Sequence, residues 1–171
     1  MNQSMNQRDM FFKWLYYAGA VLLLVLVQSL VLNRISVWAV HPFLPPVIAG
    51  IMAMLEGPAE GAVFGGIFGL LCDLTMPGVI PCFYTLAFLA AALPAAMIAK
   101  RLLSQGFLCA VLCAALALVI TDLLHTVLLT FWQGVELSAA LSLTGRELAV
   151  TVVLSPLVYL LLRSVHNRIL R

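Results

Sequence analysis

The chain has 171 residues, of which 64% are apolar and 9% are charged, and its formal net charge is +2. Soluble domains carry about 25% charged residues, so this composition excludes an ordinary soluble enzyme, a nucleic-acid-binding module and a disordered linker. What remains is a small multi-pass membrane protein, and the weak net charge gives no reason to expect a nucleic acid as partner.

Charge-free stretches follow one another along the whole chain. They are long and show no period of two, so helices are expected rather than strands. Because a helix crosses a bilayer with about 20 apolar residues, we predict an all-α integral membrane protein with about six transmembrane helices. It forms one domain over residues 1–171, with short cytoplasmic tails at 1–11 and 163–171. The stretches are 14–33, 35–55, 61–72, 74–99, 102–121 and 148–162.

The second and third stretches are shorter than ideal crossings. The second contains Pro45, Pro46 and Gly50, and the third ends at Asp73. They are either two short crossings joined at residues 56–60 or a re-entrant hairpin, which a bilayer tolerates only where other helices cover it. Both interpretations leave the flanking helices with the same orientation, so both stay open.

Lysine and arginine are unevenly divided between the two ends of the predicted helices. Cytoplasmic loops carry the excess of these residues, so the richer end is assigned to the cytoplasm, together with both termini. The first stretch is longer than the apolar core of a signal peptide and is expected to be a retained anchor. The richer end holds Arg8, Lys13, Lys100, Arg101, Arg163, Arg168 and Arg171, and the other end holds Arg34 and Arg146.

Glycine recurs at every fourth residue around the third stretch, at Gly57, Gly61, Gly65 and Gly69. On a helix these positions form a groove without side chains, which lets a neighbouring helix approach closely. Because each glycine lowers helix propensity by about 1 kcal/mol in water, a run in register indicates a required contact. That contact is either packing inside the chain or docking of a partner's helix.

Two carboxylates flank this predicted helix. Glu60 lies in its first turn, where a negative charge suits the helix dipole and the free N–H groups. Asp73 lies near the other end, where the dipole disfavours it. Acids at membrane depth usually face protein or a water-filled cavity, so Asp73 is either a functional residue or an interfacial one.

Asp122 and His125 are three residues apart in the fifth stretch and its continuation to about Phe131, so they share a helix face. We expect a neutral His125 that hydrogen-bonds Asp122 or Asp73 as a polar contact between helices. The alternatives are substrate binding, transport or a proton path, although a proton path usually needs more such pairs.

Other polar positions carry weaker signals. Gln28 interrupts the first stretch and is expected to hydrogen-bond a neighbouring helix rather than a ligand. Pro156 is expected to kink the last helix, and a disulfide between Cys72 and Cys82 is geometrically open. The sequence has no phosphate loop, nucleophile elbow or zinc-protease motif, so no catalytic residue, cofactor or metal site is predicted.

The end of the glycine pattern, Gly69-Leu70-Leu71-x-Asp73, resembles the signature of the bacterial rod shape-determining membrane protein MreD family. The layout is similar over most of the chain, with Gln28 in the first stretch, Pro42 at the start of the second apolar run, and Leu-Ser-Pro156-Leu-Val-Tyr in the last. The sequence departs from the family at Phe43, where an acid is common, and in the loop after Asp73.

This resemblance implies a non-enzymatic scaffold in the bacterial inner membrane. It would work beside MreC, the cell-elongation synthases and, indirectly, the cytoskeletal protein MreB, with self-association left open. The family fold is related to the substrate-binding subunits of energy-coupling-factor transporters, so a vitamin-transporter subunit is the alternative function. In that case the small residues of the run 90–99 would face a transporter partner, and a pocket would lie near Asp122 and His125.

Overall fold

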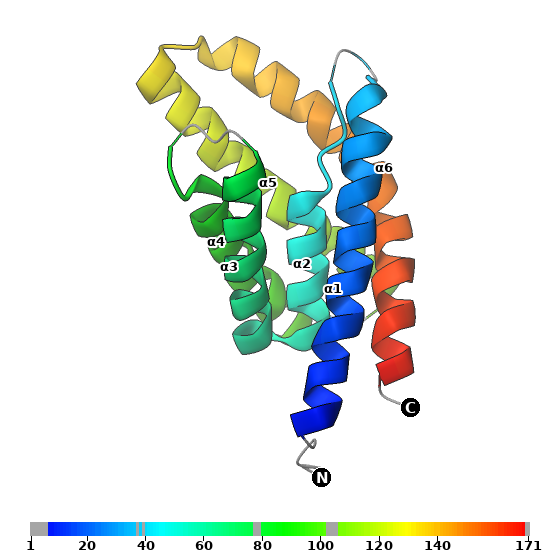
Figure 1. The fold of residues 1–171 in the computed structure, drawn as a ribbon. Helices are drawn as coiled ribbons and strands as arrows, with labels where there is room; N and C mark the ends of the chain where they lie inside the picture. Colours follow the sequence, from blue (N-terminus) through cyan, green and yellow to red (C-terminus); the bar gives the residue numbers. More distant parts are fainter. Residues whose placement is uncertain (1–6, 37, 39, 77–79, 102–105, 170–171) are drawn as a thin grey trace.

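The computed structural model describes residues 7–36, 38, 40–76, 80–101 and 106–169. Within these ranges the chain forms α-helices and a short 3-10 turn, η1, and no β-sheet, so the prediction of an all-α protein is confirmed (Figure 1). The elements are α1 (Gln7–Leu30), η1 (Leu32–Arg34), α2 (Pro45–Glu56), α3 (Pro58–Thr75), α4 (Phe83–Arg101), α5 (Phe107–Gln133) and α6 (Leu137–Ile169).

Successive helices run in opposite directions through one bundle (Figure 1). The start of α1, the turn between α2 and α3, and the end of α6 lie at one end, which we call the inner end. The loop between α5 and α6 lies at the opposite, outer end (Figure 1). This alternation places the start of α1 and the end of α6 at the same end of the bundle, and the assignment of that end to the cytoplasm stays a prediction.

Long apolar helices dominate the fold. The segments Phe12–Arg34, Phe83–Lys100, Phe107–Trp132 and Leu137–Asn167 are each long and apolar enough to cross a membrane. They indicate a multi-pass membrane protein. The second predicted stretch instead supplies a shorter apolar helix, α2, with 12 residues.

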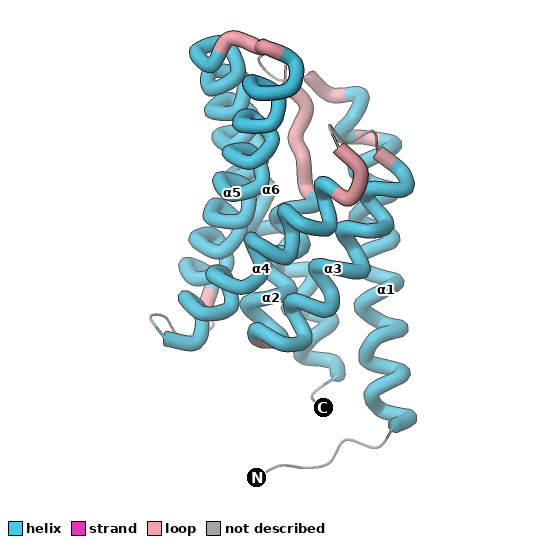
Figure 2. The backbone as a smooth tube through the Cα atoms, turned by 90° about the vertical axis from the view of Figure 1, so that its left-hand side faces the viewer, coloured by secondary structure: helices cyan, strands magenta, loops and turns pink. Residues whose placement is uncertain are grey.

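α2 is the centre of the bundle. It rises roughly 18 Å, and every residue from Pro45 to Leu55 is buried. Pro45 and Pro46 start the helix, where the missing N–H of proline breaks no hydrogen bond. The loop before Pro45 descends from the outer end of the bundle to the start of α2, as Figure 2 shows. The loop and α2 together therefore extend from the outer end of the bundle to the inner end, although α2 by itself is too short to do so.

The α2–α3 hairpin reaches the inner end of the bundle. Glu56, the last residue of α2, contacts Lys13 near the start of α1 and His166 near the end of α6. Gly57 makes the turn with a φ of +91°, a conformation that favours glycine. The turn of this hairpin therefore lies at the same end of the bundle as the start of α1 and the end of α6, and whether α2 and α3 cross the membrane or re-enter stays a prediction.

Small side chains allow α2, α4 and α5 to approach closely. A methyl group at Gly50 of α2 would lie 2.8 Å from both Ala117 Cβ and Cys113 O of α5. On α4 the alanines of the run 90–99 are mostly buried, at Ala91, Ala92, Ala95, Ala96 and Ala99. The expectation that this run faces a transporter partner is therefore wrong, because these alanines pack against the chain's own helices.

Candidate functional site

The glycine seam, Gly61, Gly65 and Gly69, faces the inside of the chain. A methyl group at Gly61 would lie 2.5 Å from Ala53 Cα on α2, and one at Gly69 would lie 2.5 Å from Thr85 Cα on α4. At Gly65 the nearest atom would be a backbone oxygen of α4, at 3.3 Å. α2 and α4 therefore occupy the seam. Of the two alternatives for the contact predicted from the glycine spacing, the structure has packing inside the chain.

Docking of a partner's helix on the glycine seam is therefore incompatible with this fold. The seam holds two helices of the same chain, and a third has no room without displacing one of them. Gly57 differs from the other three, because an added Cβ would meet nothing within 4 Å. It serves the turn between α2 and α3.

Asp73 joins the end of α3 to the start of α4. Its Oδ1 accepts a hydrogen bond from Tyr84 N at 2.8 Å, and its Oδ2 accepts from Thr85 N at 2.9 Å and Thr85 Oγ1 at 2.6 Å. The first N–H groups of a helix lack partners within it, and Asp73 satisfies two of them. These hydrogen bonds to the start of α4 are a structural reason for an acid at this position. Cys72 and Cys82 are free, so no disulfide reinforces this junction.

A polar cluster that we call the inner network joins four helices at the inner end. It consists of Lys13 and Tyr17 of α1, Glu56 of α2, Glu60 of α3 and His166 of α6. Lys13 donates to Glu56 and, at 2.8 Å, to Glu60 Oε2, while Tyr17 donates to Glu56. His166 Nδ1 lies 3.0 Å from Glu56 Oε1 and 2.7 Å from the Tyr17 hydroxyl.

The sequence pattern did not identify the inner network. Glu60 lies in the first turn of α3, as expected, but its partner Lys13 is 47 residues away. Glu56 and Lys13 mark the ends of apolar stretches, where a charge is ordinary, and the Glu56 side chain is nevertheless only 3% exposed. The one available signal was that these charges belong to the same predicted end of the bundle.

Gln28 fixes the outer half of α1. Its Nε2 donates to Pro42 O at 2.8 Å and to Asn33 Oδ1 at 2.9 Å, and its Oε1 accepts from Leu44 N at 3.1 Å. Leu44 precedes α2, so the amide ties α1 to the start of the central helix. The sequence predicts that Gln28 bonds to a neighbouring helix, and its partners lie in η1 and in the segment before α2, which ends at Leu44, the residue preceding that helix.

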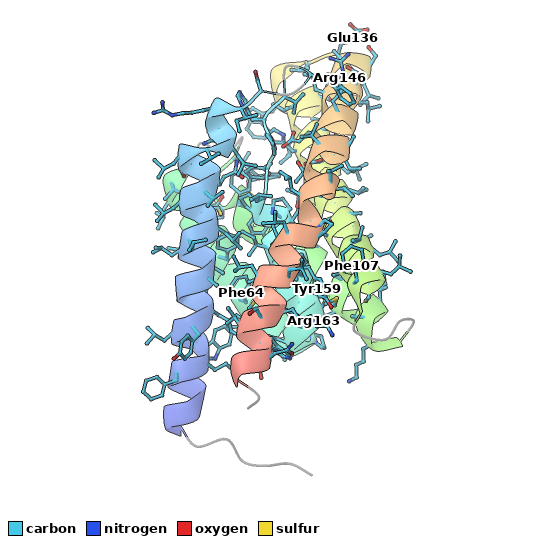
Figure 3. The ribbon with its side chains drawn as sticks, turned by 90° about the vertical axis from the view of Figure 1, so that its right-hand side faces the viewer. Phe64, Phe107, Glu136, Arg146, Tyr159 and Arg163 are labelled. Atoms are coloured by element: carbon cyan, nitrogen blue, oxygen red, sulfur yellow. The ribbon has the colours of Figure 1, made fainter. Side chains whose placement is uncertain are left out.

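An apolar groove of about 690 Å³ lies between α1 and α6; we call it the α1–α6 groove. The two helices lie close together at the inner network and diverge toward the outer end (Figure 3). Its walls include Leu24, Val27 and Val31 on α1, and Val153, Leu154 and Leu157 on α6. Val153 and Leu157 are 75% and 65% exposed, so the groove opens outward from the bundle.

Of the positions that the family resemblance singles out, Pro42 lines this groove, whereas the motif from Gly69 to Asp73 lies against the start of α4. Pro42 and Leu44 line the groove, and Gln28 bonds to both. On the opposite wall, Pro156 lies between Leu154 and Leu157. α6 continues through Pro156 over 33 residues, so the proline does not end the helix.

Asp122 and His125 do not form the predicted polar contact. The His125 ring packs on Phe83, with 5.5 Å between ring centroids, and among the described residues no hydrogen bond joins it to Asp122 or Asp73. Asp122 is 7% exposed, and its Oδ2 has no hydrogen-bond partner in the described part of the chain.

Comparisons with protein-family models, with curated proteins and with solved structures found no match to this chain. The class of protein therefore rests on the chain's own features, which are those of a helical multi-pass membrane protein. The resemblance to the MreD family stays a prediction.

Proposed function

We propose that this chain is a non-enzymatic scaffold of the bacterial cell-elongation complex in the inner membrane, with both termini in the cytoplasm. In this account the α1–α6 groove receives the single transmembrane helix of an MreC-like partner. The scaffold thereby places that partner beside the elongation synthases and, indirectly, MreB. The observation that carries the proposal is this outward-facing apolar groove, whose wall includes Pro42.

The chemistry of the groove suits a helix in lipid. Helices associate within a bilayer mainly through close packing, because lipid chains are as apolar as the side chains that face them. A cleft with aliphatic walls offers such packing on two sides at once. By contrast, an exposed face such as that around Leu160 of α6, which is 63% exposed, offers a single convex surface.

The polar contacts around the groove hold its walls in place. The inner network fixes α1 against α6 at one end, and Gln28 fixes α1 to the segment before α2 at the other. Between these points α1 needs no contact with α6. A partner helix could enter there without breaking a hydrogen bond that the structure contains.

Filling the groove tests this function. Val153→Trp places a large ring in the groove, while Leu160→Trp adds the same ring to an exposed site on the same helix outside it. Overpacking a contact costs about 1–3 kcal/mol, so recovery of co-expressed MreC with Val153→Trp should fall by about tenfold. Leu160→Trp should behave as the unchanged chain.

Cell shape provides the second readout. Val153→Trp should fail to restore rod shape in cells that depend on this chain, at normal membrane levels of the protein. Equal recovery of MreC and equal rod shape with both tryptophan variants would contradict the proposal. A vitamin-transporter subunit is less well supported, since the small residues of α4 are buried.

A further inference from the structure

Two arginines flank the outer end of the α1–α6 groove. Arg34 lies in η1, between Leu32 and Ile35, both of which line the groove. Arg146 of α6 comes four residues before Val150, so it lies on the face of α6 with which Val150 lines the opposite wall. Both arginines are exposed. Each apolar wall therefore continues outward into a positively charged residue.

Neither arginine has an ionic partner among the described residues. The ion pairs in this part of the chain all belong to the inner network, and Glu147 makes none with Arg146, although the two are neighbours in sequence. A guanidinium group presents a planar fork of donors that matches the oxygens of a phosphate. Two guanidinium groups without partners, beside one apolar groove, favour a ligand with a phosphate at one end and an apolar chain at the other.

The depth of the groove along α6 matches one leaflet of a bilayer. Arg146 lies near the outer end of the bundle and Arg163 near the inner end (Figure 3), about 26 Å apart along the helix axis. The hydrocarbon core of a membrane is about 30 Å thick, so both side chains can reach the headgroups. The groove wall from Ala149 to Val158 extends about 14 Å, which is about half of that thickness.

We propose that the α1–α6 groove binds one glycerophospholipid with an anionic phosphodiester headgroup. One acyl chain lies in the groove, whose lining residues are all apolar, and the phosphate accepts hydrogen bonds from Arg146 and Arg34. Trp38 also lines the groove and is 67% exposed, as suits an indole ring at headgroup depth. Because the groove opens outward from the bundle, the chain enters from the bilayer without moving a helix.

The lipid adds a ligand to the groove that the proposed function assigns to a partner's helix. A lipid chain and that helix cannot both fill the outer part of the groove, so docking of the partner displaces the lipid. Lipid binding itself needs no partner and is tested without one.

Native mass spectrometry of the purified full-length protein counts the lipids that it retains. The protein is titrated in detergent with phosphatidylglycerol, with phosphatidylcholine that has the same acyl chains, or with glycerol phosphate. One phosphatidylglycerol per chain should be retained, with an affinity about fivefold higher than that of phosphatidylcholine, because basic residues near a membrane surface attract anionic lipids. Glycerol phosphate has no acyl chain and should not compete.

Substitutions locate the headgroup and the chain. Arg146→Gln should lower the affinity for phosphatidylglycerol about fivefold, toward that for phosphatidylcholine, and Arg34→Gln should lower it as well. Lys100→Gln is the matched control, because it removes an exposed cation at the inner end and should keep the preference. Val153→Trp fills the groove and should reduce the retention of both lipids.

Four results would overturn the inference. They are equal affinities for phosphatidylglycerol and phosphatidylcholine, competition by glycerol phosphate, an unchanged preference in Arg146→Gln, and full lipid retention in Val153→Trp. If Arg146→Gln does not fold, Arg34→Gln decides in the same way. MreC is absent from all of these measurements, so their failure is distinguishable from failure of the scaffold function.

Discussion

At Gly61 and Gly69, a hydrogen atom occupies the space where any other residue would place a methyl group against a neighbouring backbone. The nearest atoms to such a methyl are the Cα atoms of Ala53 and Thr85, both 2.5 Å away. Backbone atoms cannot rotate aside as the end of a side chain can. The two positions therefore require glycine for packing, although each glycine weakens the helix itself.

Alanine substitutions test this requirement. Gly61→Ala and Gly69→Ala should each destabilise the folded protein by about 1–3 kcal/mol through overpacking. Gly66→Ala is the matched control on the same helix, because its methyl would lie 3.7 Å from a side-chain atom of Leu89. It should leave stability unchanged or raise it by up to about 1 kcal/mol.

Denaturant unfolding in detergent micelles measures these differences. If Gly61→Ala and Gly69→Ala proved as stable as Gly66→Ala, α2 and α4 could not lie in the seam as described. The same result would restore the seam as a surface for a partner's helix.

Sequence reasoning at this scale succeeded where spacing carries the information. The four-residue repeat predicted a close helix contact, and α2 and α4 make it at Gly61 and Gly69. It did not settle what makes the contact, because spacing says nothing about which helix lies opposite. The His125 prediction was wrong because a shared face on one helix does not set the geometry of a hydrogen bond.

At the scale of elements, α1 is attached to the bundle by polar contacts near its two ends. The inner network holds the first turns through Lys13 and Tyr17, and Gln28 holds the outer part. In lipid, apolar burial gives little net drive for helix association. Hydrogen bonds and ion pairs therefore add to close packing in holding such a helix in place.

Glu56 and Glu60 make a matched pair for testing the inner network. Both bind Lys13, but the Glu56 side chain is 3% exposed whereas that of Glu60 is 50% exposed. Removing one partner of a buried ion pair costs about 3–5 kcal/mol, so Glu56→Gln should be strongly destabilising. Glu60→Gln should cost no more than about 1 kcal/mol, because solvent screens the exposed pair.

Two measurements suffice for this pair. Stability is measured by denaturant unfolding. Detachment of α1 is measured by placing one cysteine at the start of α1 and one at the end of α6, because the two form a disulfide only while the helices stay side by side. Similar stability of Glu56→Gln and Glu60→Gln would show that Glu56 is not the centre of the network.

The helices could largely be predicted from the charge-free stretches, because length and apolar composition fix most transmembrane helices. The continuation of the fifth helix beyond Asp122 is confirmed by α5, which ends at Gln133. The central position of α2 could not be predicted. From Pro45 to Leu55 it is apolar on all sides, so no face of the sequence marks which neighbours cover it.

At the scale of the whole molecule, the bundle presents a concave apolar surface that faces outward, the α1–α6 groove. The glycine seam, in which partner docking was the open alternative, is closed by the fold. The groove is formed by helices at opposite ends of the chain, so no local pattern reveals it. Pro42 lines it, and Gln28 of α1 holds Pro42 in place through a hydrogen bond to its carbonyl oxygen.

The most direct test places a photo-crosslinking amino acid at position 153 in the groove, or at position 160 outside it, in living cells that carry tagged MreC. The account predicts a covalent adduct with MreC from position 153 and little or none from position 160. No MreC adduct from position 153, or equal adducts from both positions, would contradict the proposal that a partner helix binds between α1 and α6.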